Sequence, residues 1–139
     1  MNLKKNVQNK NYYVMNALIN SVQLLGRLGA DPEVKTTNQG TKVCNTRLAT
    51  NEYSKNPQGE WVETTFWHTL VLWGKLAEKV EQEAKKGTRL LVHGILTYRE
   101  YTDTNNIRKE FTEIKVKQLL VLGQAKNGDV VISETVEES

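Results

Sequence analysis

Hydrophobic and polar residues alternate along most of the chain between residues 19 and 123, and this two-residue period is typical of β-strands. Residues 74–86 have helical spacing instead, with one apolar face, and Gly87 follows as a stop signal. Asp31-Pro32 and Asn56-Pro57 mark turns between apolar segments. The pattern predicts one helix between the third and fourth of five strands, which lie at about 22–28, 42–51, 61–73, 88–101 and 110–122.

This order of elements is that of the OB-fold, which commonly binds single-stranded oligonucleotides. Other small α+β domains can have the same order, so the order alone leaves them open. We predict an all-β protein of the OB-fold class, a five-stranded Greek-key barrel with one α-helix between strands 3 and 4.

The third predicted strand holds all three tryptophans of the chain. Side chains on a strand point alternately to its two faces. The even positions from Val62 to Leu72 are mostly apolar, so we expect them in the core. The odd positions, which include Trp61, Trp67 and Trp73, then lie on the opposite face. Exposed aromatics on that face need a cover. A neighbouring subunit, the helix or a stack of unpaired bases could each supply it.

The fourth and fifth predicted strands favour bases as the cover. Arg99 and Tyr101 emerge together near the end of the fourth strand, on the face opposite Tyr98 and the inward apolar residues. On the fifth strand, Lys115 and Lys117 are expected to face outward while their apolar neighbours face inward. Aromatic rings interleaved with cations supply stacking and phosphate neutralisation, the two requirements of single-strand binding.

Composition narrows the classes of function. The length of 139 residues suits one domain, and no apolar run approaches the twenty or so residues of a membrane helix. No signal peptide is recognisable, so we expect no secretion by that route and no membrane partner. A single cysteine, Cys44, and two histidines leave little for a metal site, and we expect Cys44 to be a small buried hydrophobe.

Charge divides the chain into three parts. Residues 1–18 form an expected flexible basic arm, since residues 1–20 contain three lysines and no acidic residue. Residues 19–123 form the expected OB-fold domain. Residues 124–139 form a short acidic tail in which Asp129 and three glutamates outnumber Lys126. The net charge of +3 is weak evidence for a nucleic-acid partner.

Four segments resemble the bacterial single-stranded DNA-binding proteins, in the family's order and over about residues 19–123. They read LLGRLGADPEV (24–34), TRLAT (46–50), FWHTLVLWGKLAEKV (66–80) and VHGILTYREYTD (92–103). The resemblance implies an OB-fold, a homotetramer and sequence-independent binding and protection of single-stranded DNA in replication, recombination and repair. It also implies a cytoplasmic, nucleoid-associated bacterial protein.

The resemblance also implies site residues. The family's stacking positions correspond to Tyr53, Trp67, Trp73 and Tyr101, and its phosphate contacts to Lys35, Lys75, Lys86 and Arg99. Lys115 and Lys117 join the phosphate contacts from strand parity alone. Four positions that are basic in relatives carry uncharged side chains here, namely Ser21, Asn56, Thr69 and Thr97.

The C-terminus differs from the family pattern. The typical member ends in several Asp residues followed by Ile-Pro-Phe, which recruits replication and repair proteins. This sequence ends Glu-Thr-Val-Glu-Glu-Ser, without Pro or Phe. Replication and repair proteins therefore stay open as partners, but the ending that recruits them in the family is absent from this sequence.

Three alternatives remain open. A nuclease could use Asp31, Glu33 or Glu63 to hold a metal ion, but these carboxylates lack ligand-like spacing, so we expect no enzyme, no metal and no cofactor. An RNA-binding OB module would use the same stacking, since only contacts to the 2′-OH separate RNA from DNA. A primosome accessory of the same fold would be mainly dimeric.

Overall fold

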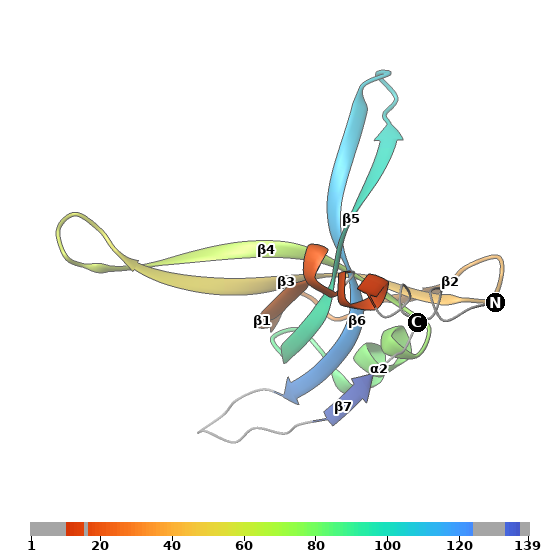
Figure 1. Ribbon diagram of the computed structural model, residues 1–139, viewed down its shortest axis with the longest axis horizontal. Coiled ribbons are helices and arrows are strands. Elements are labelled where there is room, and N and C mark those ends of the chain that lie inside the picture. Colours follow the sequence, from red (N-terminus) through yellow and green to blue (C-terminus); the bar gives the residue numbers. More distant parts are fainter. Residues whose placement is uncertain (1–10, 16, 124–132, 137–139) are drawn as a thin grey trace.

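The computed structural model of the chain describes residues 11–15, 17–123 and 133–136. Long strands and one short helix make up its body (Figure 1). The elements are β1 (Val22–Leu28), β2 (Val34–Thr36), β3 (Lys42–Lys55), β4 (Trp61–Trp73), α2 (Lys75–Glu83), β5 (Arg89–Thr102), β6 (Arg108–Gly123) and β7 (Ser133–Val136).

Five of these strands close into a barrel. The hydrogen-bonded order is β1-β5-β6-β4-β3, and β1 returns to pair with β3 through Arg27 and Leu28. All of these pairs are antiparallel except β4 with β6, which is parallel at Leu70 and Ile114. With α2 between the third and fourth barrel strands, the predicted five-stranded barrel and helix position are confirmed.

Two glycines let the barrel close. A Cβ atom at Gly26 would overlap the carbonyl oxygen of Ala49, and one at Gly94 would overlap the carbonyl oxygen of Lys115. The register of β5 against β6 also shifts between His93 and Gly94, as at a β-bulge. Glycine is required at such points because any side chain would force neighbouring backbones apart.

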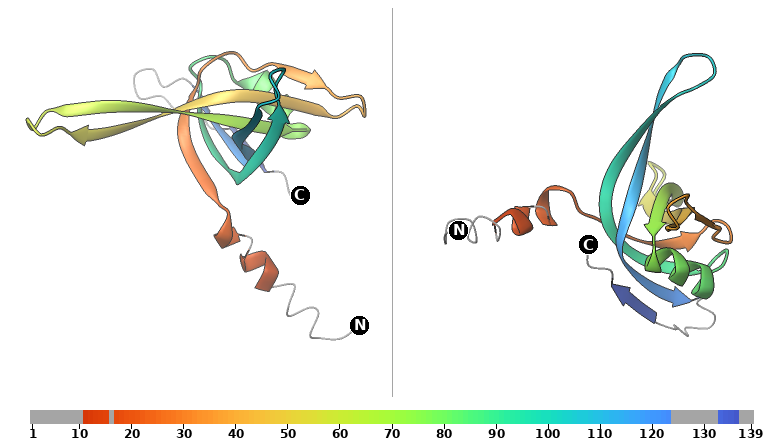
Figure 2. Two further views of the ribbon diagram at one scale, coloured as in Figure 1. Left: turned by 90° about the horizontal axis from the view of Figure 1, so that it is seen from above. Right: turned by 90° about the vertical axis from the view of Figure 1, so that its right-hand side faces the viewer.

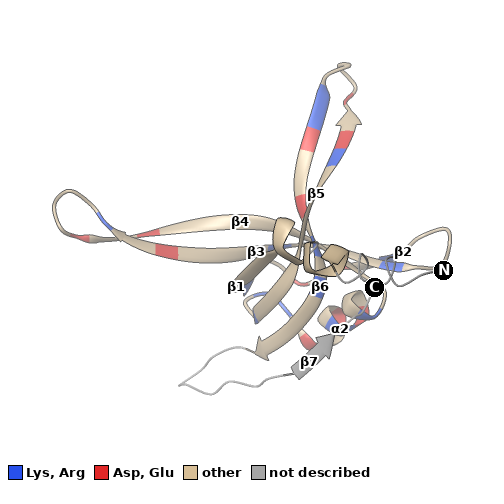
Figure 3. Ribbon diagram, in the orientation of Figure 1, with Lys and Arg blue, Asp and Glu red and all other residues tan. Residues whose placement is uncertain are grey.

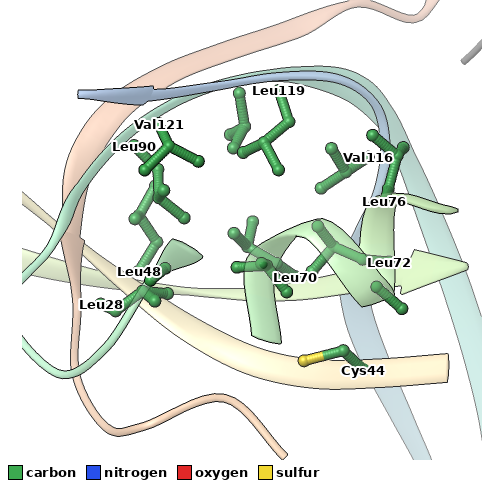
Figure 4. Close-up of a cluster of buried hydrophobic side chains, with 14 of the residues drawn as sticks. Leu28, Cys44, Leu48, Leu70, Leu72, Leu76, Leu90, Val116, Leu119 and Val121 are labelled. Carbon is green, nitrogen blue, oxygen red and sulfur yellow. The ribbon is translucent and has the colours of Figure 1, made fainter. Parts of the chain in front are cut away.

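The core fills the barrel and extends under α2 (Figure 4). The helix contributes the face predicted from its spacing, with Leu76, Ala77 and Val80 almost fully buried. It is shorter than the predicted 74–86 and ends at Glu83, so Lys85 and Lys86 follow it rather than lie in its last turn.

Two hairpins extend beyond the barrel as arms that point in different directions (Figures 1 and 2). The first arm is the outer part of β3 and β4, and the second is the outer part of β5 and β6. The first arm replaces a predicted loop at 52–60, because β3 continues to Lys55 and pairs with Trp61. Only the tip turns: the side chain of Asn56 accepts hydrogen bonds from the backbone N–H groups of Gln58 and Glu60.

The predicted core was wrong for the residues that lie in the arms. Leu70 and Leu72 are buried as expected, but Val62, Thr64 and Phe66 on the same face of β4 are exposed. Tyr98, expected to face inward from β5, is exposed for the same reason. Strand parity assigns a face correctly, but a face is buried only where the barrel lies behind it.

The two termini hold elements that the sequence pattern did not predict. Residues 11–15 and 17–19 are helical with exposed side chains, within and just after the predicted arm 1–18. β7, in the predicted tail, pairs antiparallel with β6 at residues 118–121. The remainder of both predicted segments, residues 1–10, 16, 124–132 and 137–139, lies outside the described residues. Within the described part of the chain, no helix is long and apolar enough to cross a membrane.

Candidate nucleic-acid interface

One face of the β3–β4 ribbon carries three of the four aromatic residues that the sequence analysis named as stacking residues. We define this outer face by the odd-numbered positions of both strands. The register pairs Val43 with Trp73, Ala49 with Trp67 and Tyr53 with Glu63, and paired residues share a face. Trp67 is 50% exposed, Trp73 is 38% exposed and Tyr53 is 62% exposed. The predicted common face of Trp61, Trp67 and Trp73 is therefore present, and Tyr53 on the neighbouring strand shares it. Solvent reaches all of these rings.

Trp67 occupies the centre of this outer face. Its ring lies so close to Gly29 that a Cβ there would be 2.5 Å from the indole carbon Cζ3. The guanidinium of Arg47 lies 5.0 Å from the ring centroid, a cation–π contact. An open hollow of about 390 Å³ adjoins the ring and is lined by Asn45 of β3 and by residues of the β1–β2 connection, including Asp31. Its size is within the ~300–1,000 Å³ of small-ligand sites.

The second arm carries Tyr101 in a different setting. Tyr101 stacks on Phe111 with ring centroids 5.0 Å apart and an interplanar angle of 5°. Arg99 also contacts Phe111: its guanidinium lies over the Phe111 ring, 5.4 Å from the centroid. Tyr101 and Arg99 do emerge together, as predicted, but each already has a partner.

Arg99 is also paired with a carboxylate. Its Nε and Nη2 atoms donate to the same oxygen of Glu113, at 3.2 and 2.9 Å. The Arg99 side chain is 65% exposed and that of Glu113 only 11%. The positive charge predicted to meet phosphate is thus opposed by a mostly buried carboxylate on the neighbouring strand.

The predicted lysines lie at several places around the barrel. Lys35 pairs with Val43, which pairs with Trp73, so a cation and an indole share one row of the sheet. Lys75, exposed, begins α2 two residues after Trp73. Lys115 and Lys117 are half-buried on β6 beside the buried Ile114 and Val116, which confirms the predicted alternation.

Lys86 is positioned by its backbone. Its N–H donates to the Asp31 carboxylate at 2.7 Å, which ties the segment after α2 to the β1–β2 connection. Asp31 also lines the hollow beside Trp67, so the Lys86 backbone lies near the outer face. Figure 3 shows that Lys and Arg are interspersed with Asp and Glu on both arms.

Three further residues at the interface were not named as site residues by the sequence analysis, although it did place Trp61 on the outward face of its strand. Trp61 lies on the outer face at the tip of the first arm and is 68% exposed; its odd parity was the signal that could have found it. Phe111 stacks on Tyr101, and its odd position among lysines carried a similar signal. Arg47 could not have been found, because its contact with Trp67 depends on the pairing of β3 with β4.

Two titratable groups among the described residues have clearly shifted pKa values, and burial is the main cause of both shifts. Burial is the main reason that the pKa of the Cys44 thiol is raised to about 11, and Cys44 is fully buried as predicted. Burial also lowers the pKa of His68, whose Nε2 lies 2.8 Å from the Thr50 hydroxyl. No group of three or more potential metal ligands occurs among the described residues.

Comparison with known proteins identifies the family of this chain. The model of the single-strand binding protein family matches residues 19–122. Single-stranded DNA-binding protein 1 of Chlorobaculum tepidum is 40% identical over 111 residues, which cover 79% of this chain and 68% of the relative. The protein of the same name from Xylella fastidiosa is 36% identical over 116 residues, covering 83% and 85%.

A solved structure extends the likeness to three dimensions. The one described as "Plasmodium falciparum SSB complex with ssDNA" has a TM-score of 0.64 and 29% identity, and the match covers 83% of this chain and 95% of that one. The OB-fold predicted from the order of strands and helix is thereby confirmed. The structure has a closed five-stranded barrel with an exposed aromatic face, and the family model matches residues 19–122. The chain therefore belongs to the single-strand binding protein family.

Proposed function

We propose that the chain binds single-stranded DNA without sequence preference and protects it, acting by binding rather than by catalysis. The observation that carries this proposal is the outer face of the β3–β4 ribbon, where exposed aromatic rings lie in line beside cationic side chains. Such a face offers large flat surfaces to unpaired bases and gives duplex DNA, whose bases are already stacked, little to bind.

In the proposed mechanism, bases stack on Tyr53, Trp67, Trp73 and Tyr101. Each stacked base contributes about 1–3 kcal/mol and any base can serve, because every base has a flat face. Arg47 covers part of the Trp67 ring, so a base stacks there beside the guanidinium or after Arg47 has moved aside. Tyr101 offers the base the ring face that is not stacked on Phe111. Both rings are held against the sheet before DNA arrives, which lowers the entropic cost of binding.

Phosphates are neutralised by side chains around these rings. The proposed contacts are Lys35, Lys75, Lys86 and Arg99, with Lys115 and Lys117 as further contributors. Counterion release makes such binding weaken with salt, with a slope of about −0.7 per neutralised phosphate on single strands.

The wider setting follows from the family. We propose roles in replication, recombination and repair in the bacterial cytoplasm at the nucleoid, with residues 19–123 as the binding domain, 1–18 as a basic arm and 124–139 as an acidic tail. We also propose a homotetramer. In its support, residues 22–26 of β1 pair only with β5 among the described strands, which leaves an edge for a second copy.

The test is a tryptophan-fluorescence titration with long oligo-dT at low and high salt, with duplex DNA and matched RNA as comparisons. We expect strong quenching by oligo-dT, weaker binding at high salt and little change with duplex. Equal or tighter binding of the RNA would favour the RNA-binding alternative. An unquenched, folded protein would mean that the tryptophans serve a protein contact. Sedimentation of the same sample separates a tetramer from the dimer expected of a primosome accessory.

A further inference from the structure

The tip of the first arm carries two residues that the proposed site does not include, Trp61 and Lys55, next to the proposed stacking residue Tyr53. We call Tyr53, Lys55 and Trp61 the tip cluster. Trp61 is the most exposed of the three tryptophans, at 68%, and its cross-strand partner is Lys55. The Lys55 ammonium lies 5.2 Å from the Trp61 ring centroid. Tyr53, two residues before Lys55, is 62% exposed on the same face.

Trp61 lies outside the hydrophobic core. The barrel core is built from other residues, and the arm tip is closed by the Asn56 side chain together with backbone hydrogen bonds between Asn56 and Glu60. A large exposed indole is costly in water unless it is covered at some stage of the protein's work. Its cover therefore comes from outside the described chain.

The position of Trp61 continues the outer face rather than starting a new one. Along β4, Trp73, Trp67 and Trp61 follow one another at intervals of six residues, each interval about 20 Å long. An even interval keeps all three indoles on one face. A single strand of DNA that runs along this face from the barrel outward would pass Trp73, Trp67, Tyr53 and finally Trp61.

We propose that the tip cluster is a further binding site for single-stranded DNA, with a base stacked on Trp61 and the adjacent phosphate on Lys55. The inference rests on the proposed function and extends it, because the arm then lengthens the strand of DNA that each chain covers. The tip cluster combines the two requirements of single-strand binding in one cross-strand pair: a flat ring and a cation.

The chain offers a matched control on the opposite face of the same arm. Phe66 is also an exposed aromatic residue of β4, at 47%, but it lies at an even position, away from the tryptophans. Trp61→Ala and Phe66→Ala thus remove comparable exposed rings from the two faces of one ribbon. Trp61→Phe keeps a flat ring at the tip and tests whether the ring is what matters.

The experiment measures the affinity of the full chain and these variants for oligo-dT of increasing length. We expect Trp61→Ala to bind long oligonucleotides at least about fivefold more weakly than the parent, with no change on the shortest ones that bind. Phe66→Ala and Trp61→Phe should follow the parent within about twofold. In a Trp67→Phe/Trp73→Phe variant, where Trp61 is the only indole, long oligo-dT should quench the fluorescence and the shortest should not.

Several results would overturn the inference. One is that Trp61→Ala binds long oligonucleotides as tightly as the parent. Another is that Trp61→Ala and Phe66→Ala lose the same amount of affinity. A third is that Trp61 fluorescence stays unquenched when the protein is saturated with long oligo-dT. A change in sedimentation of Trp61→Ala without DNA would also overturn it, because the cover would then be a second copy. Failure of the proposed function is a separate result, in which the parent binds no oligo-dT of any length.

Discussion

Replacing Glu113 by Gln should strengthen the dependence of DNA binding on salt. In the free protein the Arg99 guanidinium donates two hydrogen bonds to one Glu113 oxygen, so its charge is opposed before a phosphate arrives. Glu113→Gln keeps the shape of the side chain and removes the negative charge. Arg99 then remains on its strand but can meet a phosphate without giving up an ionic partner.

The magnitude follows from the exposure of the pair. Because the Arg99 side chain is 65% exposed, solvent screens the ion pair, and such pairs contribute about 0–1 kcal/mol to stability. The variant should therefore lose no more than about 1 kcal/mol of unfolding free energy. In the parent the ion pair opposes the proposed Arg99–phosphate contact, so its removal adds at most one full contact. The salt slope then steepens by up to ~0.7, which corresponds to roughly two- to threefold more affinity lost between ~50 and 200 mM salt.

The assay is a set of oligo-dT titrations at four or more salt concentrations, for the parent and for two matched variants. Glu100→Gln removes the same charge from the opposite face of the second arm, where Glu100 pairs with Arg108. Its slope should equal that of the parent. In the double variant Glu113→Gln/Arg99→Gln the added slope should disappear. A Glu113→Gln slope equal to the parent's, or an equal change in Glu100→Gln, would refute the reasoning.

Three further outcomes are expected. Trp67→Ala and Trp73→Ala should each weaken oligo-dT binding by about 1–3 kcal/mol while circular dichroism stays native, and parent-like affinity in both would end the stacking assignment. Gly94→Ala should lower the unfolding free energy by about 1–3 kcal/mol or more, since its Cβ overlaps the Lys115 carbonyl; unchanged urea denaturation would contradict this. Because burial lowers the pKa of His68, the unfolded chain binds the proton more readily, so stability should fall as pH drops below about 6.5. His68→Asn should flatten that dependence in the same denaturation assay, and an equal dependence in both proteins would exclude His68 as its source.

The sequence predicted the face of each strand residue well, because strand pleating alone decides it. The alternation along β4 correctly placed Trp67 and Trp73 opposite Leu70 and Leu72, because pleating fixes the face of every strand residue. It failed at Val62 and Phe66, since alternation does not tell how far a strand runs past the core. The acidic partner of Arg99 was equally out of reach, because it depends on the register between β5 and β6.

The closure of the barrel has a consequence for the speed of folding. Each arm belongs to a hairpin whose strands are neighbours in sequence and can pair early around a short turn. Closing the barrel instead requires β1 to find β5, where Val22 pairs with Gly94, and requires the parallel contact of β4 with β6. Pairings between distant segments are slow to form. The hairpins that present the aromatic rings should therefore acquire their register first, and the rate-limiting step should be the docking of β1, which joins the finished hairpins into one cooperative unit.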